Sequence, residues 1–296
     1  RCETLTINKS SNPASGSNAD TTLNDSLTYS SVYGLRIQDK EISIGKAEIL
    51  RVHAIFESDD NNDPNIPTLT LININGSLLN AAQGDLIEGS SSHAIGRVIS
   101  TTATTISFVY KNDREFQLNE SITLKLSQIT GSITSITPGD KDIVQNYSVD
   151  TGHRLEFLDF GRIIRRESSP IPSKRLTIVY DYYSTPTSDD GEFFSYLSWP
   201  PGIVNFNIDM PRIGANIRES DVIDFRPRVS DYTNTSYSPF QYESRIFPND
   251  GSSVTSTPVI GESIVLGYSY KLPRTDKLIL SKGGEFQLVS GEPSDN

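Results

Sequence analysis

The three histidines are too far apart in the sequence to predict a metal site or a catalytic base. His53 falls in a strand-like segment, His93 in a Ser-rich turn and His153 in an Asp-Thr-Gly-His loop. A metal site needs ligands that converge, often at short spacings, and the chain has no HxH or HExxH pair. We interpret all three as structural or surface residues, and we expect no metal and no cofactor.

One acidic loop comes close to a calcium motif. Asp59, Asn61 and Asp63 follow the alternation that opens an EF-hand loop. That loop requires glycine at the next position and glutamate at the twelfth, where this chain has Pro64 and Thr70. A solvated acidic loop is the prediction, and calcium binding at 59–63 remains an open alternative.

The sequence offers no convincing enzyme site. Asp150-Thr151-Gly152 matches three letters of the aspartic-protease motif but lacks its apolar flanks and a second copy. There is no Gly-x-Ser-x-Gly nucleophile elbow. The 37 acidic residues are spread along the chain, so any glycosidase-like pair could be drawn and none is informative. We therefore expect that the protein is not an enzyme.

A cluster of basic residues favours a structural or binding role. Arg162, Arg165 and Arg166 form the compact basic cluster of the sequence and lie close to Asp159. We interpret these four residues as a structural salt-bridge cluster, with contact to an anion or a partner as the alternative.

Aromatic residues gather at the end of the clearest predicted strand, 175–183, and just after it. Alternating aromatics in β sequence are most often core, but they also build protein interfaces and platforms for sugars. The residues we single out for interface or glycan contact are Tyr182, Tyr183, Phe193, Phe194, Tyr196 and Trp199.

Composition limits the classes of protein to consider. Hydrophobic residues make up 35% and charged residues 21% of 296, and the net charge is −11. Nucleic-acid binders normally present a basic face, so this acidic balance disfavours nucleic acid. A single cysteine, Cys2, excludes an internal disulfide. No apolar run approaches the roughly 18 to 20 residues of a spanning helix, and we expect no membrane insertion.

The elements that must position these residues are strands. Alternating segments such as 69–74, 105–110 and 175–183 are five to nine residues long and recur about every ten residues over much of the chain. The segment 155–164 mixes helical spacing with a glycine and stays ambiguous. We predict an all-β fold of several small β-sandwich or barrel-like domains joined by Pro/Gly/Ser-rich linkers.

The composition shifts suggest five segments. We expect an extended arm or linker at 1–30 that is ordered only if something else holds it. Strands at 31–66 and 136–250 are assigned to a main β domain, with a small inserted β domain at 67–135. A C-terminal β-meander at 258–296 is expected to lead into further sequence, because the chain begins with arginine and reads as part of a longer polypeptide.

Several blocks resemble a family of phage virion proteins. They are residues 41–58, 150–162, 176–183, 221–229 and 268–278. In order and approximate spacing they are similar to tail-fibre or baseplate-type structural proteins of contractile-tailed, myovirus-like marine cyanophages. His153 departs from the pattern, where a polar amide is expected. The Gly-Asp-x-Ile-x-Gly block at 84–98 is similar to small β modules inserted in such proteins.

The resemblance implies a structural component of a phage tail, without catalytic residues. It would assemble with other tail or baseplate proteins as a homo-oligomer, a trimer by the resemblance, and would be found in the virion, extracellular when mature. A glycan-binding adhesin or receptor-binding module that recognises a host surface glycan or protein is the alternative. A polysaccharide depolymerase is a weaker one, because such enzymes commonly use short fixed-period repeats that this chain lacks.

Overall fold

The computed structural model describes residues 2–10, 18–19, 33–184, 212–213, 217–218, 224, 226–234, 236–247, 261, 263, 265, 272 and 274–294. Its described elements are strands and three short 3-10 helices, which confirms the predicted all-β class. The chain divides into two compact units, which are described separately. The first comprises 1–193 with 226–255, and the second 194–225 with 256–296.

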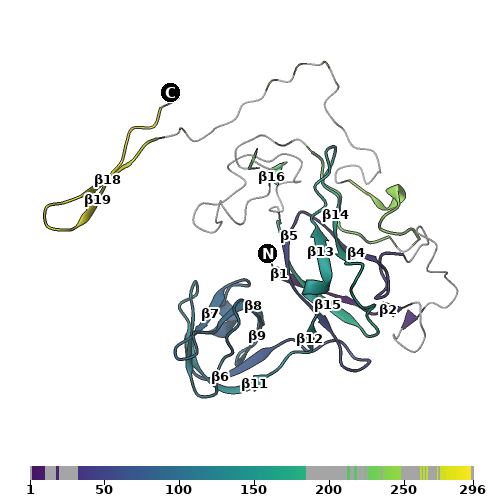
Figure 1. Cartoon of the computed structure of the whole chain (residues 1–296), viewed down its shortest axis with the longest axis horizontal. Coiled ribbons are helices and arrows are strands. Elements are labelled where there is room, and N and C mark those ends of the chain that lie inside the picture. Colours follow the sequence, from purple (N-terminus) through teal and green to yellow (C-terminus); the bar gives the residue numbers. More distant parts are fainter. Residues whose placement is uncertain are drawn as a thin grey trace. The chain divides into compact units, whose positions relative to one another are not determined.

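Part of the first unit is a closed barrel of six antiparallel strands (Figure 1). Around the barrel the order is β10-β11-β6-β9-β8-β7, and β7 pairs with β10 to close it. The strands are β6 (Thr68–Asn75), β7 (Leu86–Gly89), β8 (Ile95–Thr101), β9 (Thr105–Tyr110), β10 (Ser121–Leu124) and β11 (Thr130–Thr137), and the 3-10 helix η1 (Leu78–Asn80) follows β6. The barrel occupies the segment for which an inserted domain is predicted and ends two residues beyond it.

Strand alternation fills the barrel with apolar side chains, because every second residue points inward. Leu69 and Leu71 of β6 are fully buried, as are Ile106 and Phe108 of β9. Packing favours glycine at position 96, because a Cβ there would lie only 2.7 Å from the Phe108 ring. A barrel this small is therefore a packed core and not a channel.

The rest of the first unit is built on two sheets that share one core. The four-stranded sheet has the order β1-β15-β5-β12 and the three-stranded sheet the order β13-β14-β4. Their strands are β1 (Cys2–Ile7), β4 (Glu41–Ala47), β5 (Ile49–Glu57), β12 (Lys141–Asp142), β13 (Tyr147–Asp150), β14 (Phe160–Arg165) and β15 (Leu176–Tyr182), with η2 (Val144–Asn146) and η5 (Tyr242–Ser244) as short 3-10 helices. Glu48, at a φ of 57°, turns the chain from one sheet into the other.

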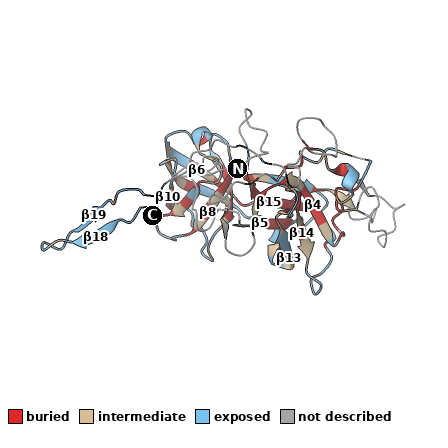
Figure 2. Ribbon diagram, turned by 90° about the horizontal axis from the view of Figure 1, so that it is seen from above, coloured by how far each residue is buried: buried red, intermediate tan, exposed pale blue. Residues whose placement is uncertain are grey.

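The barrel is an insertion between β5 and β12 of the four-stranded sheet. A second apolar cluster joins the two bodies, with Cys2, Phe56 and Val179 from the sheet against Ile99 and Val109 from the barrel. As a result β15, between β1 and β5, has six consecutive buried residues. Figure 2 shows this concentration of buried residues along β15, β5 and β4.

Two segments differ from the sequence expectation. Residues 2–7, expected to belong to an arm, form β1 and pair along their whole length with β15. The ambiguous segment 155–164 is a loop followed by most of β14, whose residues pair with β13 and β4. Two further short strands, β2 (Lys9–Ser10) and β3 (Asn18–Ala19), pair in parallel.

The second unit contains two small described hairpins. One joins β16 (Arg212–Ile213) to β17 (Ile217–Arg218), and the other joins β18 (Lys277–Leu280) to β19 (Phe286–Val289). Of the meander expected at 258–296, the structure describes this last hairpin and some residues around it, and most of 264–271 lies outside the described residues. Within the described ranges no helix is long and apolar enough to cross a membrane.

Candidate interaction sites

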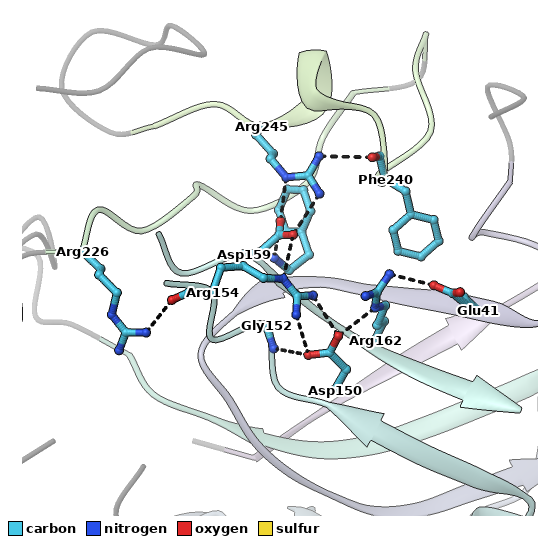
Figure 3. A network of polar contacts seen from close by, with 10 residues as sticks. Glu41, Asp150, Gly152, Arg154, Asp159, Arg162, Arg226, Phe240 and Arg245 are labelled. Carbon is cyan, nitrogen blue, oxygen red and sulfur yellow. Dashed lines mark hydrogen bonds and ion pairs between the residues drawn. The ribbon is translucent and has the colours of Figure 1, made fainter. Parts of the chain in front are cut away.

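A polar network surrounds Asp150, at the end of β13 (Figure 3). Arg154 binds both of its carboxylate oxygens, at 3.2 and 2.8 Å, and Arg162 Nε donates to it at 2.9 Å. The Gly152 amide adds a bond of 3.0 Å. Burial acts to raise the pKa of Asp150, but these hydrogen bonds outweigh it and hold the pKa below its usual value. The Asp-Thr-Gly segment therefore holds an ionised, structurally engaged carboxylate.

A second carboxylate, Asp159, lies beside the first and shares Arg154 with it. Arg245 donates from Nε and Nη2 to its two oxygens, each at 2.8 Å, and Arg154 Nε lies 3.5 Å away. Arg245 also stacks over the Phe157 ring and donates to the Phe240 carbonyl. The network thus ties the 226–247 segment to the strands β13 and β14, as Figure 3 shows.

The four residues predicted as one salt-bridge cluster are distributed over several contacts. Arg162 binds Asp150 and also Glu41, at 2.7 Å. Arg165 donates to the Gln38 carbonyl and Arg166 to the Tyr147 carbonyl. Asp159 forms its ion pairs instead with Arg154 and Arg245. The pairing with Arg245, 86 residues further along the chain, has no local sequence signal.

A groove of about 400 Å³ runs along the outer side of β1, facing β4. At one end Lys46 Nζ lies 2.6 Å from Asp231 and 3.6 Å from Glu3. Tyr182 donates its hydroxyl to Glu3 at 2.6 Å, and the Lys46 ammonium lies over the Tyr182 ring. Burial acts to raise the pKa of Glu3, but the bonds from Tyr182 and Lys46 outweigh it and lower the pKa. The groove also has apolar and tyrosine walls, so it suits a small polar ligand with apolar faces. Its lining residues include Leu5, Leu35, Ile44, Tyr180 and Tyr232.

The aromatic residues predicted for interface or glycan contact are only partly described. Tyr182 is half-buried against the main core and contacts the groove through Glu3 and Lys46. Tyr183 is half-buried, and its amide donates to the Glu48 carbonyl at 3.1 Å. The remaining four, Phe193, Phe194, Tyr196 and Trp199, lie outside the described residues.

A buried charged contact joins the barrel to the four-stranded sheet. His53 Nε2 of β5 and Arg97 Nη2 of β8 lie 2.8 and 2.7 Å from the same oxygen of Asp181. Lys111 Nζ lies 3.3 Å from His53 Nδ1. Burial lowers the pKa of His53 and the Asp181 carboxylate offsets this only in part, so the imidazole is neutral at pH 7.

Burial, and then Asp181, raises the pKa of Cys2 to about 11, which keeps this sulfur a thiol and a poor nucleophile.

The acidic loop that resembles a calcium motif is bonded to its own chain. Asp60 accepts the Asn62 amide at 2.6 Å, and Asp63 pairs with Arg175 at 2.8 Å. Lys174 donates to the Asn61 side chain at 2.7 Å. Among the residues described, no group of three or more His, Cys, Asp or Glu side chains is placed to hold a metal ion.

The β18–β19 hairpin has a wholly apolar face. The register places Leu278 opposite Leu288 and Leu280 opposite Phe286, and opposed residues share a face of the pleat. All four side chains are between 59% and 71% exposed. Figure 2 shows both strands as exposed.

Comparison of the chain with protein-family models, with curated proteins and with solved structures gave no match, so the function is argued from these sites.

Proposed function

We propose that this protein is a structural component of a bacteriophage tail, of the fibre or baseplate kind, and that it acts through protein–protein assembly. In the mature particle it would be part of the virion and face the extracellular medium. The observation that carries the proposal is the locked junction between the barrel and the four-stranded sheet.

Three kinds of contact make this junction stiff. The chain passes from sheet to barrel and back through a neck where Asn65 donates its amide and side chain to Asp140, at 2.9 and 3.2 Å. Apolar residues of both bodies form one cluster, and half-buried Arg97 of the barrel pairs with buried Asp181 of the sheet in the same contact. A small module that only carried a binding loop would not require such a contact. A particle that bears mechanical load would require it, because flexible joints between domains neither transmit force nor hold the domains in fixed positions.

The location of the family-like sequence blocks supports the same role. Residues 41–58 are the strands β4 and β5, and 176–183 contain the central strand β15. The block 150–162 contains the two aspartates of the Figure 3 network and Arg154. These three blocks therefore fall on core strands and on ion pairs that connect segments distant in the sequence, as expected of blocks that share a structural role.

The experiment that tests this is immunogold labelling of purified virions from a contractile-tailed phage that encodes the chain. An antibody against residues 140–296 should label the baseplate or the fibres. Virions disrupted by mild denaturant provide the control for a covered epitope. Label on the capsid alone, or no label even on disrupted particles, would overturn the proposal.

A second candidate, glycan binding, is favoured by the groove beside β1. Its carboxylates, lysine and tyrosines offer hydrogen-bonding groups next to apolar walls. Asp231 is a suitable probe, because its side chain is 63% exposed and its loss should leave the fold intact. In calorimetric titrations with host-envelope polysaccharide, Asp231→Asn should weaken binding, whereas Asp113→Asn on the exposed barrel surface should not. Absence of heat with the unaltered protein would count against this candidate.

A further inference from the structure

The apolar face of the β18–β19 hairpin, which consists of Leu278, Leu280, Phe286 and Leu288, is a surface that requires a partner. A two-stranded hairpin alone in water is marginally stable at best. Contiguous exposed apolar surface on a protein marks an interaction site. The opposite face is mixed, since Lys277 pairs with Val289 and Ile279 with Gln287. Only one face of this hairpin is therefore built for burial.

Hydrogen bonds close the hairpin at both of its ends. The Gly284 amide donates to the Ser281 carbonyl and the Ser281 amide to the Glu285 carbonyl, at 3.0 and 2.8 Å, which closes the turn. At the open end the Gly291 amide donates to Asp276 at 2.9 Å. The apolar face is thus presented by a hairpin fixed at both ends, which reduces the entropy lost when a partner binds.

We propose that this face docks onto the same face of another copy of the chain. The inference rests on the proposed function in so far as that function assigns the chain a role in assembly. It goes further by naming the surface and its occupant.

Charge supports a second copy as the occupant. The whole chain has a net charge of −11, so most pairs of surfaces on two copies repel each other. The hairpin segment 274–294 is an exception. Its three basic residues, Arg274, Lys277 and Lys282, balance its three acidic residues, Asp276, Glu285 and Glu292. Two copies can approach there without a net electrostatic cost.

The size and chemistry of the face also fit self-association. It has four large hydrocarbon side chains and no polar group that would select a different partner. Two faces packed as stacked sheets, about 10 Å apart, would remove on the order of 1,000 Å² from water, which is the lower bound for a specific interface. Opposed pairs of similar size let the face pack against its own two-fold copy.

The test is the oligomeric state of the full chain, measured by light scattering after size-exclusion chromatography. The unaltered protein should self-associate. Leu288→Asp places an unpaired charge in the contact and should raise the dissociation constant roughly 100-fold or more. Gln287→Asp adds the same charge to the same strand on the opposite face and should leave the constant within about threefold. A monomeric unaltered protein, or equal effects of the two variants, would overturn the proposal.

A second measurement covers the case in which Leu288→Asp fails to fold. Leu288→Cys and Gln287→Cys each add one exposed thiol, because the native Cys2 is buried. Under mild oxidation the cysteine at 288 should link two copies at least tenfold faster than the cysteine at 287. Equal rates would overturn the proposal. Virion label on the tail combined with a monomeric chain would reject self-docking and leave the proposed function standing.

Discussion

Arg97 of the barrel and Asp181 of the four-stranded sheet meet at 2.7 Å, although 84 residues separate them in the chain. The aspartate is buried and also faces His53, whereas the arginine donates its other terminal nitrogen to the Gly84 carbonyl at 2.9 Å. The contact connects two bodies that each have a core of their own. It is therefore the place where their folding stabilities are coupled.

Replacing Arg97 by alanine should lower the free energy of unfolding by about 2 kcal/mol, because it leaves the buried Asp181 carboxylate with one partner fewer. Urea unfolding monitored by fluorescence would measure the change. Lys125→Ala is the matched control, since it removes an exposed ion pair with Glu88 within the barrel and should cost at most about 1 kcal/mol. Equal losses in the two variants would contradict a special role for the junction.

The same contact predicts a dependence of stability on pH. The pKa of His53 in the folded protein lies below 6.5, its ordinary value in the unfolded chain. At a pH between the folded and the unfolded pKa, the unfolded chain therefore binds a proton at His53 and the folded chain does not. The stabilisation is therefore complete above about pH 6.5 and declines as the pH falls, by up to about 1.4 kcal/mol per pH unit. Asp181, Arg97 and Lys111 face the imidazole and set its environment. Urea midpoints at pH 7.5 and 5.5 should differ more for the unaltered protein than for His53→Gln. Identical differences would refute the assignment.

Gly152 tests the backbone of the Figure 3 network. Its φ is 86°, and a Cβ there would overlap the carbonyl oxygen of Asp159, a residue held by Arg245 through its side chain and by the Gly152 carbonyl through its amide. We expect Gly152→Ala to cost more than about 2 kcal/mol in thermal or urea unfolding. Gly45→Ala is the control, because Gly45 has a φ of 73° but its Cβ would meet Tyr232 Cβ at an ordinary 3.4 Å. That variant should lose about 1 kcal/mol from φ alone. A similar loss in both would mean that the overlap is relieved.

Asp85, the aspartate of the Gly-Asp-x-Ile-x-Gly block, has a structural role in the barrel. Its two buried oxygens accept the amides of Leu126 and Ser127 at 2.7 and 2.8 Å, which fixes the turn after β10 onto the start of β7. Asp85→Ala should cost about 1–3 kcal/mol, because these amides lose their acceptor. Hydrogen exchange should accelerate at 126 and 127 and stay unchanged at Ile178 in the sheet. Asp113→Ala, at an exposed position, should change neither. Uniform acceleration would show instead that the barrel and the sheet open together.

Much of the barrel could be predicted from the sequence, because its information is local. Alternation in 69–74 and 105–110 identifies strands, and the glycines between strands mark turns. The first strand is not predicted because its apolar residues, at 2, 5 and 7, alternate only in part and lead directly into a Ser- and Asn-rich stretch. Their pairing partner, β15, follows about 170 residues later. Burial of this strand is a property of its tertiary neighbours and leaves little mark on so short a segment.

The ion pairs were predicted less well than the strands. Asp159 was grouped with the arginines closest in sequence, yet it binds Arg154 and Arg245, because the loop that contains Arg245 folds back over β14. The apolar hairpin face is an intermediate case. Strands at 277–280 and 285–289 follow from the pattern, but the turn sets the register, and the register decides which side chains share a face. Long-range pairing and register are the two quantities that a single sequence leaves open.

The neck of the barrel has a consequence for how such chains can diversify. Thr68 and Thr137, the first and last residues of the barrel strands, are direct register partners, and Asn65 and Asp140 are bonded to each other just outside them. The barrel thus leaves the sheet and returns to it at one point. Its removal would leave a gap that a tight turn could close, and a different compact module could be spliced into the same point without moving β5 or β12. Backbone connectivity therefore permits exchange of the barrel for another compact module, provided that the new module also covers Cys2, Phe56 and Val179 and pairs with Asp181.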